Sequence, residues 1–222
     1  MIPSPLHRLR LSLLLGGWVA ALLVARVALS GTSFGLFLPW NLFLAAVPLA
    51  ASTALVGLDA RGARPAALLT LGAVWLLFLP NAPYILTDLV HLGPRTGVPF
   101  WYDLALLLSA AGTGLLAAYV SLADIQAVLT RRLGAAAAWA VSVGVLFLSA
   151  FGVYLGRELR WNSWDVLTAP GALLADIAGR VLDPLAHPTT VVMTVVFGGM
   201  LTLGYVALRL VAQPPGADVR RR

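Results

Sequence analysis

Cysteine is absent from the 222 residues, and lysine is absent as well. Without cysteine the chain cannot form disulfides, use a thiol as a nucleophile or bind a metal through thiolates. Charged side chains make up only 11% of the sequence, and all 15 basic residues are arginines. So little charge excludes the composition of a soluble globular domain.

Hydrophobic residues account for 60% of the chain, and the mean hydropathy is +0.90. A helix of about 20 apolar residues crosses a bilayer, and six stretches meet that length. Their approximate bounds are 11–29, 34–56, 66–87, 103–123, 135–155 and 189–211. We therefore predict an all-α fold, a polytopic transmembrane helical bundle formed by one domain over 1–212, with the first span uncleaved. A disordered basic tail is expected over 213–222.

The third span is too short to cross a bilayer unless it includes a polar motif that contains two prolines. Ala66 to Leu79 would form about 21 Å of helix, whereas the hydrocarbon core is about 30 Å thick. The span must therefore continue into Pro80-Asn81-Ala82-Pro83-Tyr84, where the prolines break the helix. Asn81 is a candidate cap for the helix that follows. A break at membrane depth is tolerated only against protein or a wet cavity.

Polar side chains recur at helical spacing directly after this break. Tyr84, Thr87, Asp88 and His91 fall on one predicted face, opposite Ile85 and Leu89. A carboxylate and an imidazole one turn apart can share a proton or a divalent metal ion, so Asp88 and His91 are candidate catalytic or metal-binding residues. An interfacial position at the end of the span explains them equally well.

Asp103 follows an aromatic belt at the start of the fourth span. It either caps that helix or faces Asp88 and His91 across a short loop, which would make it a third catalytic candidate. After the same span, Asp124, Arg131 and Arg132 are predicted to form a solvated charged loop.

A second polar cluster follows the fifth span. Arginine suits phosphate or carboxylate groups, and tryptophan can stack on a sugar or hold a headgroup. An interfacial tryptophan belt with snorkelling arginines is the alternative. Together with Asn81 and Tyr84, the candidate substrate- or anion-binding residues of this cluster are Arg157, Arg160, Trp161, Asn162, Trp164 and Asp165. Further along, Asp176 and Arg180 are spaced as an ion pair on a short amphipathic helix, which we expect on the membrane surface between spans five and six.

The arginines indicate the orientation of the chain. Six spans place both termini on one side, and cytoplasmic loops carry an excess of arginine. With the termini in the cytoplasm, ten arginines lie inside and five outside. The five are Arg26, Arg95, Arg157, Arg160 and Arg180. Both polar clusters then face the extracytoplasmic side, and the net charge of +6 suits anionic lipid rather than nucleic acid.

Three motifs resemble one known family. They are Leu79-Pro80-Asn81-Ala82-Pro83-Tyr84 with Thr87-Asp88, Trp101-Tyr102-Asp103, and Gly156-Arg157 with Arg160-Trp161-Asn162-Ser163-Trp164-Asp165. This combination resembles the bacterial membrane family catalogued as domain of unknown function 1361, from about Phe34 to the last span. The resemblance implies a multi-pass protein of the bacterial inner membrane and supplies no catalytic residues.

Three functions are compatible with these residues. The first is an enzyme that acts on a lipid-linked or envelope substrate, in which Asp88 and His91 serve as acid and base or hold a divalent metal. The second is a small transporter or channel with a broken third helix. The third is a structural or partner-binding protein whose polar clusters lock loops over the bundle. The sequence leaves the substrate, the reaction, the cofactor and the oligomeric state open.

Overall fold

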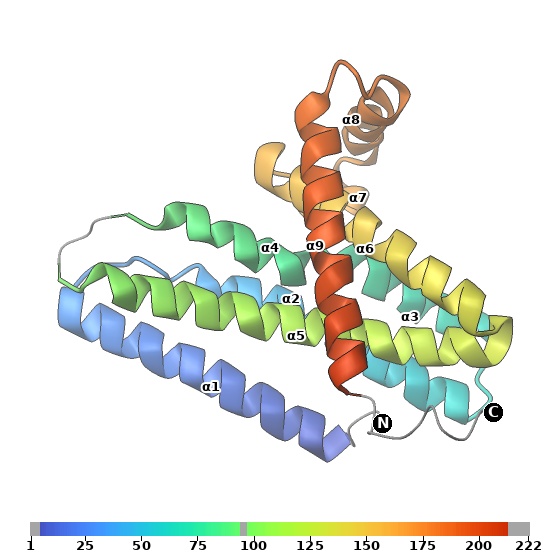
Figure 1. Ribbon diagram of the computed structural model, residues 1–222, viewed down its shortest axis with the longest axis horizontal. Helices are drawn as coiled ribbons and strands as arrows, with labels where there is room; N and C mark the ends of the chain where they lie inside the picture. Colours follow the sequence, from blue (N-terminus) through green and yellow to red (C-terminus); the bar gives the residue numbers. More distant parts are fainter. Residues whose placement is uncertain (1–4, 94–96, 213–222) are drawn as a thin grey trace.

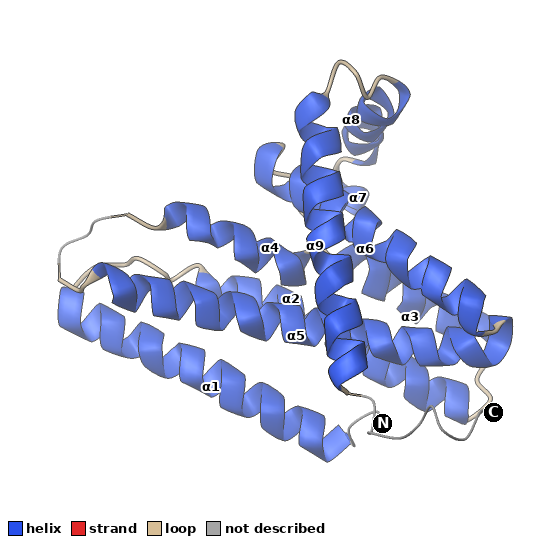
Figure 2. Ribbon diagram, viewed as in Figure 1, coloured by secondary structure: helices blue, strands red, loops and turns tan. Residues whose placement is uncertain are grey.

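The computed structural model describes residues 5–93 and 97–212, which form helices joined by short turns (Figure 1, Figure 2). The helices are α1 Pro5–Ser30, α2 Leu38–Ala60, α3 Pro65–Phe78, α4 Asn81–Thr87, the 3₁₀ turn η1 Asp88–His91, α5 Phe100–Leu133, α6 Ala135–Glu158, α7 Asp165–Thr168, α8 Pro170–Leu182 and α9 Pro188–Val211. Within these ranges there is no strand. The predicted all-α fold is confirmed, and the tail predicted over 213–222 lies outside the described residues.

Six segments of the described chain are long and apolar enough to cross a membrane, as predicted. They are Arg10–Ser30, Leu38–Ala60, Pro65–His91, Phe100–Leu133, Ala135–Glu158 and Pro188–Val211. Figure 1 shows α1, α2 and α5 running lengthwise beside one another, while α9 crosses this group steeply in the view. The buried core includes Leu38, Ile85, Leu106, Leu146 and Leu201, which come from α2, α4, α5, α6 and α9 in that order.

The third span is broken at the predicted place. Helix α3 ends at Phe78, and α4 begins at Asn81 after Leu79 and Pro80. The predicted cap is wrong, because Asn81 is the first residue of α4 and not the residue before it. Its side-chain Nδ2 donates a hydrogen bond to the carbonyl of the preceding Phe78 at 2.9 Å. Asn81 thereby satisfies a carbonyl that the end of α3 leaves without a helical partner.

Glycines let neighbouring helices pack tightly against the break. A Cβ atom at Gly152 of α6 would lie 2.6 Å from Cγ of Pro80, and one at Gly114 of α5 would lie 2.6 Å from the carbonyl oxygen of Ala82. Both distances are shorter than any normal van der Waals contact. The broken backbone is therefore enclosed by protein, which is the condition for such a break at membrane depth.

Helix α5 is longer than the fourth predicted span, at 34 residues or about 51 Å. The charged loop predicted after it is wrong, because Asp124, Arg131 and Arg132 all belong to this helix. Asp124 is buried and accepts a hydrogen bond from the Ser52 hydroxyl at 3.1 Å. Arg131 and Arg132 instead bind Asp59 at the end of α2, so these charges join two helices.

The short helix predicted between the fifth and sixth spans is α8. Its Asp176 and Arg180 form the expected ion pair at 3.0 Å. Leu174 and Val181 on the same helix are exposed. These apolar side chains are consistent with the predicted position on a membrane surface.

Candidate functional site

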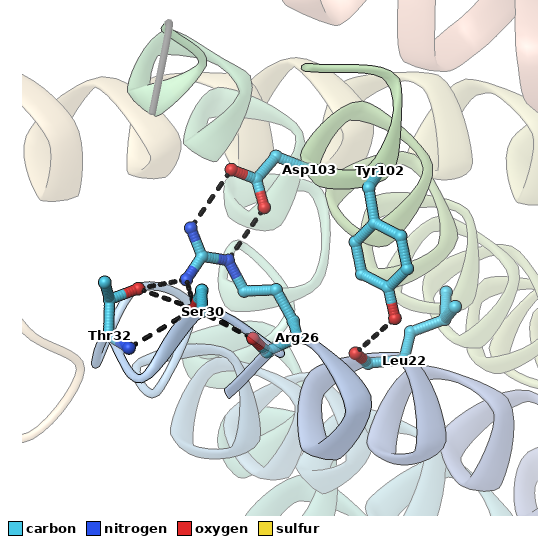
Figure 3. Close-up of polar contacts among 6 residues, drawn as sticks. All are labelled: Leu22, Arg26, Ser30, Thr32, Tyr102 and Asp103. Carbon is cyan, nitrogen blue, oxygen red and sulfur yellow. Dashed lines mark hydrogen bonds and ion pairs between the residues drawn. The ribbon is translucent and has the colours of Figure 1, made fainter. Parts of the chain in front are cut away.

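Asp103, one of the three catalytic candidates, forms a buried ion pair with Arg26 (Figure 3). Nε of Arg26 donates to Oδ1 of Asp103 at 2.8 Å, and Nη2 donates to Oδ2 at 3.2 Å. The exposed fractions of the two side chains are 0% and 2%. Both carboxylate oxygens are therefore engaged in a bidentate contact that joins α1 to α5.

The second terminal nitrogen of Arg26 is also engaged. Its Nη1 donates to the hydroxyl oxygens of Ser30 and Thr32, and its guanidinium lies 4.7 Å from the ring centroid of Phe34. Nearby, the Tyr102 hydroxyl donates to the Leu22 carbonyl at 2.9 Å, which gives α1 and α5 a second link (Figure 3). An arginine whose three nitrogens all form hydrogen bonds indicates a structural clamp. Sequence reasoning missed Arg26, although an arginine within an apolar helix requires a buried partner.

Asp88, the second catalytic candidate, is held by two other helices. Nδ2 of Asn41 on α2 donates to Oδ2 of Asp88 at 2.9 Å, and Nη1 of Arg157 on α6 lies 3.4 Å from Oδ1. The side chain of Asp88 is buried, as is that of Ile85. Arg157 also contacts Tyr84 and His91, which belong with Asp88 to the predicted polar face.

His91, the third candidate, lies with Arg157 at the exposed end of the same group. Nη2 of Arg157 is 3.4 Å from Nε2 of His91. A guanidinium has donors only, so this contact is a hydrogen bond from Arg157 when Nε2 carries no proton. Asp88 is 3% exposed, Arg157 is 17% exposed and His91 is exposed. The three side chains thus lead from the core to the surface.

A groove of about 590 Å³ lies beside these residues. Asn41 and Tyr84 connect the groove to the charged residues, because both line the groove. Asn41 binds Asp88, and the centroid of the Tyr84 ring lies 5.9 Å from Cζ of Arg157. Further polar lining comes from Asn81, Trp161, Asn162 and Ser163. The other lining residues are largely apolar and come mainly from α3, α6 and α8, including Leu77, Leu148, Phe151, Leu155, Leu173 and Ile177. The groove therefore combines a polar end with an apolar wall.

The second predicted cluster forms one side of this groove. Nδ2 of Asn81 donates to the Ser163 hydroxyl at 2.8 Å, which joins the break in the third span to the loop after α6. Nε1 of Trp161 donates to Asp176 of α8 at 2.8 Å. Trp164 packs edge-on against Trp40 with ring centroids 6.3 Å apart. The structure thus brings the first and second polar motifs together.

Two predicted anion-binding residues lie elsewhere in this loop. Asp165 accepts hydrogen bonds from the Asn162 backbone N–H at 2.7 Å and from the Thr168 hydroxyl at 2.9 Å, and these bonds lower the pKa of its carboxyl group. Its contacts are those of a residue that closes a turn. Arg160 is exposed and has a φ of 62°, in the left-handed region. Arg157 is therefore the arginine at the site.

The described residues include no group of three or more histidine, cysteine or acidic side chains that could hold a metal ion. Asp88 and His91 are both near Arg157, whose permanent positive charge opposes a divalent cation at the same place. The donor set therefore does not fit a divalent metal, which the sequence left open as one role for Asp88 and His91. An anion is the better match for this charge.

Fold and site together define a polytopic helical membrane protein with an amphipathic groove. Residues 40–203 match the family model described as "Protein of unknown function (DUF1361)". The chain belongs to this family, as its three motifs predict. Neither the curated proteins nor the solved structures contain a match.

Proposed function

We propose that this protein binds a lipid-linked substrate in the groove beside Arg157 and acts on its anionic headgroup. The observation that carries the proposal is the composition of the groove: an apolar wall from α3, α6 and α8 meets Asn41, Asn81 and Tyr84 at one end. Ligand sites of this kind have volumes of about 300–1,000 Å³ and a few polar groups that fix orientation. The alkyl part would lie along the wall, with the headgroup at the polar end.

Arg157 is the residue that we assign to the headgroup. Its guanidinium contacts Asp88 at 3.4 Å, a long distance for a charged hydrogen bond, and its side chain is 17% exposed. It therefore keeps donors that a phosphate or carboxylate can use. Asp88 is a positioning residue, because its buried carboxylate sets the place of the guanidinium and is itself fixed by Asn41.

His91 is the residue that we assign to proton transfer. The imidazole is exposed beside Arg157, so a headgroup bound to the arginine would lie next to its ring. Imidazole changes protonation near neutral pH and is the most frequent general acid or base in enzymes. We place this chemistry on the extracytoplasmic side of a bacterial inner membrane, in line with the distribution of arginines.

Native mass spectrometry of the purified protein with a lipid extract from the host membrane tests the binding step. We expect wild type to retain a lipid that carries an anionic headgroup. Arg157→Gln should weaken this retention about tenfold or more, because a hydrogen bond to a charged group is worth about 1.5–3 kcal/mol. Arg160→Gln removes the same charge three residues away and should retain the lipid. Equal retention by wild type and Arg157→Gln, or equal loss in both variants, would contradict the assignment.

The catalytic step is tested separately with the lipid that wild type retains. We expect wild type to convert this lipid on incubation, whereas His91→Ala binds it and leaves it unchanged. A His91→Ala variant that converts the lipid at the wild-type rate would remove His91 from the mechanism. Retention without conversion by wild type would reduce the function to lipid binding.

The transporter alternative rests on the break between α3 and α4. That break is packed against Gly152 and Gly114, with no room for even a Cβ atom at either position. Such packing favours a fixed structural element over a transport path. Flux through proteoliposomes that depends on Asn81 and Asp88 would nevertheless decide in favour of transport.

A further inference from the structure

A second groove, lined by other residues, has a different character. It has a volume of about 760 Å³ and lies between α1, α2 and α5. Its lining is almost entirely apolar, with residues such as Leu15, Leu42, Phe43 and Leu116. This groove shares no lining residue with the groove beside Arg157, so it is a separate site.

The shape of this groove follows from small side chains on all three helices. Gly16 and Ala20 line it from α1, Ala45 and Ala46 from α2, and Ala117 from α5. At Gly16 an added Cβ atom would meet nothing within 4 Å, so the space in front of this residue is open. Along α1 the lining runs from Arg10 to Leu23, which corresponds to about 20 Å of helix. A long, narrow apolar channel of this kind matches an extended hydrocarbon chain.

Arg10 supplies the one charge among the described lining residues, and it lies at one end of the groove. It is exposed and is the first residue of the first candidate span, where a helix meets the lipid headgroups. A guanidinium at that depth attracts a phosphate group. Ser12, two residues further on, adds a hydroxyl to the same end.

We propose that this groove is a binding site for an anionic phospholipid, with one acyl chain between α1, α2 and α5 and the headgroup phosphate on Arg10. The lipid would belong to the leaflet in which the N-terminal end of α1 lies. It would fill the space that the small side chains leave, and it would fix α1 against the rest of the bundle. The site is independent of the proposed function, because neither Arg157 nor His91 takes part in it.

Two neighbouring glycines provide a matched test. Gly16→Leu places a side chain in the open groove. Gly17 does not line the groove, and a Cβ atom there also meets nothing within 4 Å, so Gly17→Leu adds the same side chain outside the groove. The probes are phosphatidylglycerol and phosphatidylcholine, added to the delipidated protein in detergent and detected by native mass spectrometry. Helical circular dichroism and a single size-exclusion peak establish that each variant is folded.

We expect wild type and Gly17→Leu to retain phosphatidylglycerol, and Gly16→Leu to lose most of it. Arg10→Gln should reduce the preference for phosphatidylglycerol over phosphatidylcholine, whereas Arg61→Gln, which removes an exposed arginine outside the groove, should keep it. Equal retention by both glycine variants would overturn the acyl-chain site. An unchanged lipid preference in Arg10→Gln would overturn the headgroup assignment. A Gly16→Leu variant that changes the oligomeric state but not lipid retention would assign the groove to a second copy of the chain.

Discussion

Arg26 and Asp103 illustrate what a single charged residue requires inside an apolar bundle. An unpaired ion in a medium of low dielectric constant is very costly, so each of these residues needs the other. Asp103 lies in the first turn of α5, but Pro99 occupies the cap position that the sequence suggested for Asp103. The sequence also did not reveal its partner, which lies 77 positions earlier in the chain. A contact over that separation depends on how two helices pack, which neither hydropathy nor spacing specifies.

This pair leads to a prediction about stability. Arg26→Gln and Asp103→Asn should each lower the free energy of unfolding by about 3–5 kcal/mol, because either change leaves a buried charge without its partner. Reversible unfolding in mixed micelles measures the effect. The double variant Arg26→Met with Asp103→Leu removes both charges and should be more stable than either single variant. If Asp103→Asn leaves stability unchanged but abolishes an identified activity, Asp103 is catalytic and the clamp assignment is wrong.

Among the helices and turns, the break in the third span was the feature best anticipated by the sequence. Fourteen apolar residues are too few to cross a bilayer, and two prolines cannot continue a regular helix, so length and composition alone locate the break. Length and composition could not predict that the side chain of Asp88 is buried. Its segment ends in a 3₁₀ turn, whose side-chain spacing differs from that of the α-helix assumed for the polar stripe.

The close packing of this break gives a second stability prediction. Gly152→Ala should destabilise the protein by about 1–3 kcal/mol, because its Cβ atom would lie 2.6 Å from the ring of Pro80. Gly144→Ala on the same helix is the matched control: a Cβ atom there meets nothing within 4 Å, and alanine favours helix over glycine. Thermal unfolding of the two variants side by side measures the difference. Equal melting temperatures would show that α6 does not pack on the break as described.

At the scale of the whole molecule, composition and the lengths of the apolar runs correctly predicted a helical protein with six segments long and apolar enough to cross a membrane. The convergence of the two polar motifs on one groove needed the structure, although the predicted orientation places them on the same side. The loop after α6 meets the break in the third span through Asn81 and Ser163, which are 82 positions apart. The apolar groove beside α1 could not be predicted, because small side chains along a helix indicate close packing as readily as open space.

The absence of cysteine makes the predicted orientation directly measurable. Single cysteines at Arg61, between α2 and α3, and at Leu185, between α8 and α9, replace exposed side chains at what we propose are opposite membrane faces. A membrane-impermeant maleimide added to intact cells should label the cysteine at 185 and should label the cysteine at 61 only after permeabilisation. The reverse pattern would place the groove beside Arg157 on the cytoplasmic side.

The central claim is that the groove beside Arg157 holds a lipid-linked substrate, and photocrosslinking in intact cells tests it most directly. A photoreactive amino acid at Val166, which lines the groove, is compared with the same amino acid at Leu167, which does not line it and is 84% exposed. We predict that Val166 captures a lipid with an anionic headgroup, and that Arg157→Gln abolishes this capture. If both positions capture the same mixture of bulk lipids, and Arg157→Gln does not change this capture, the claim is contradicted.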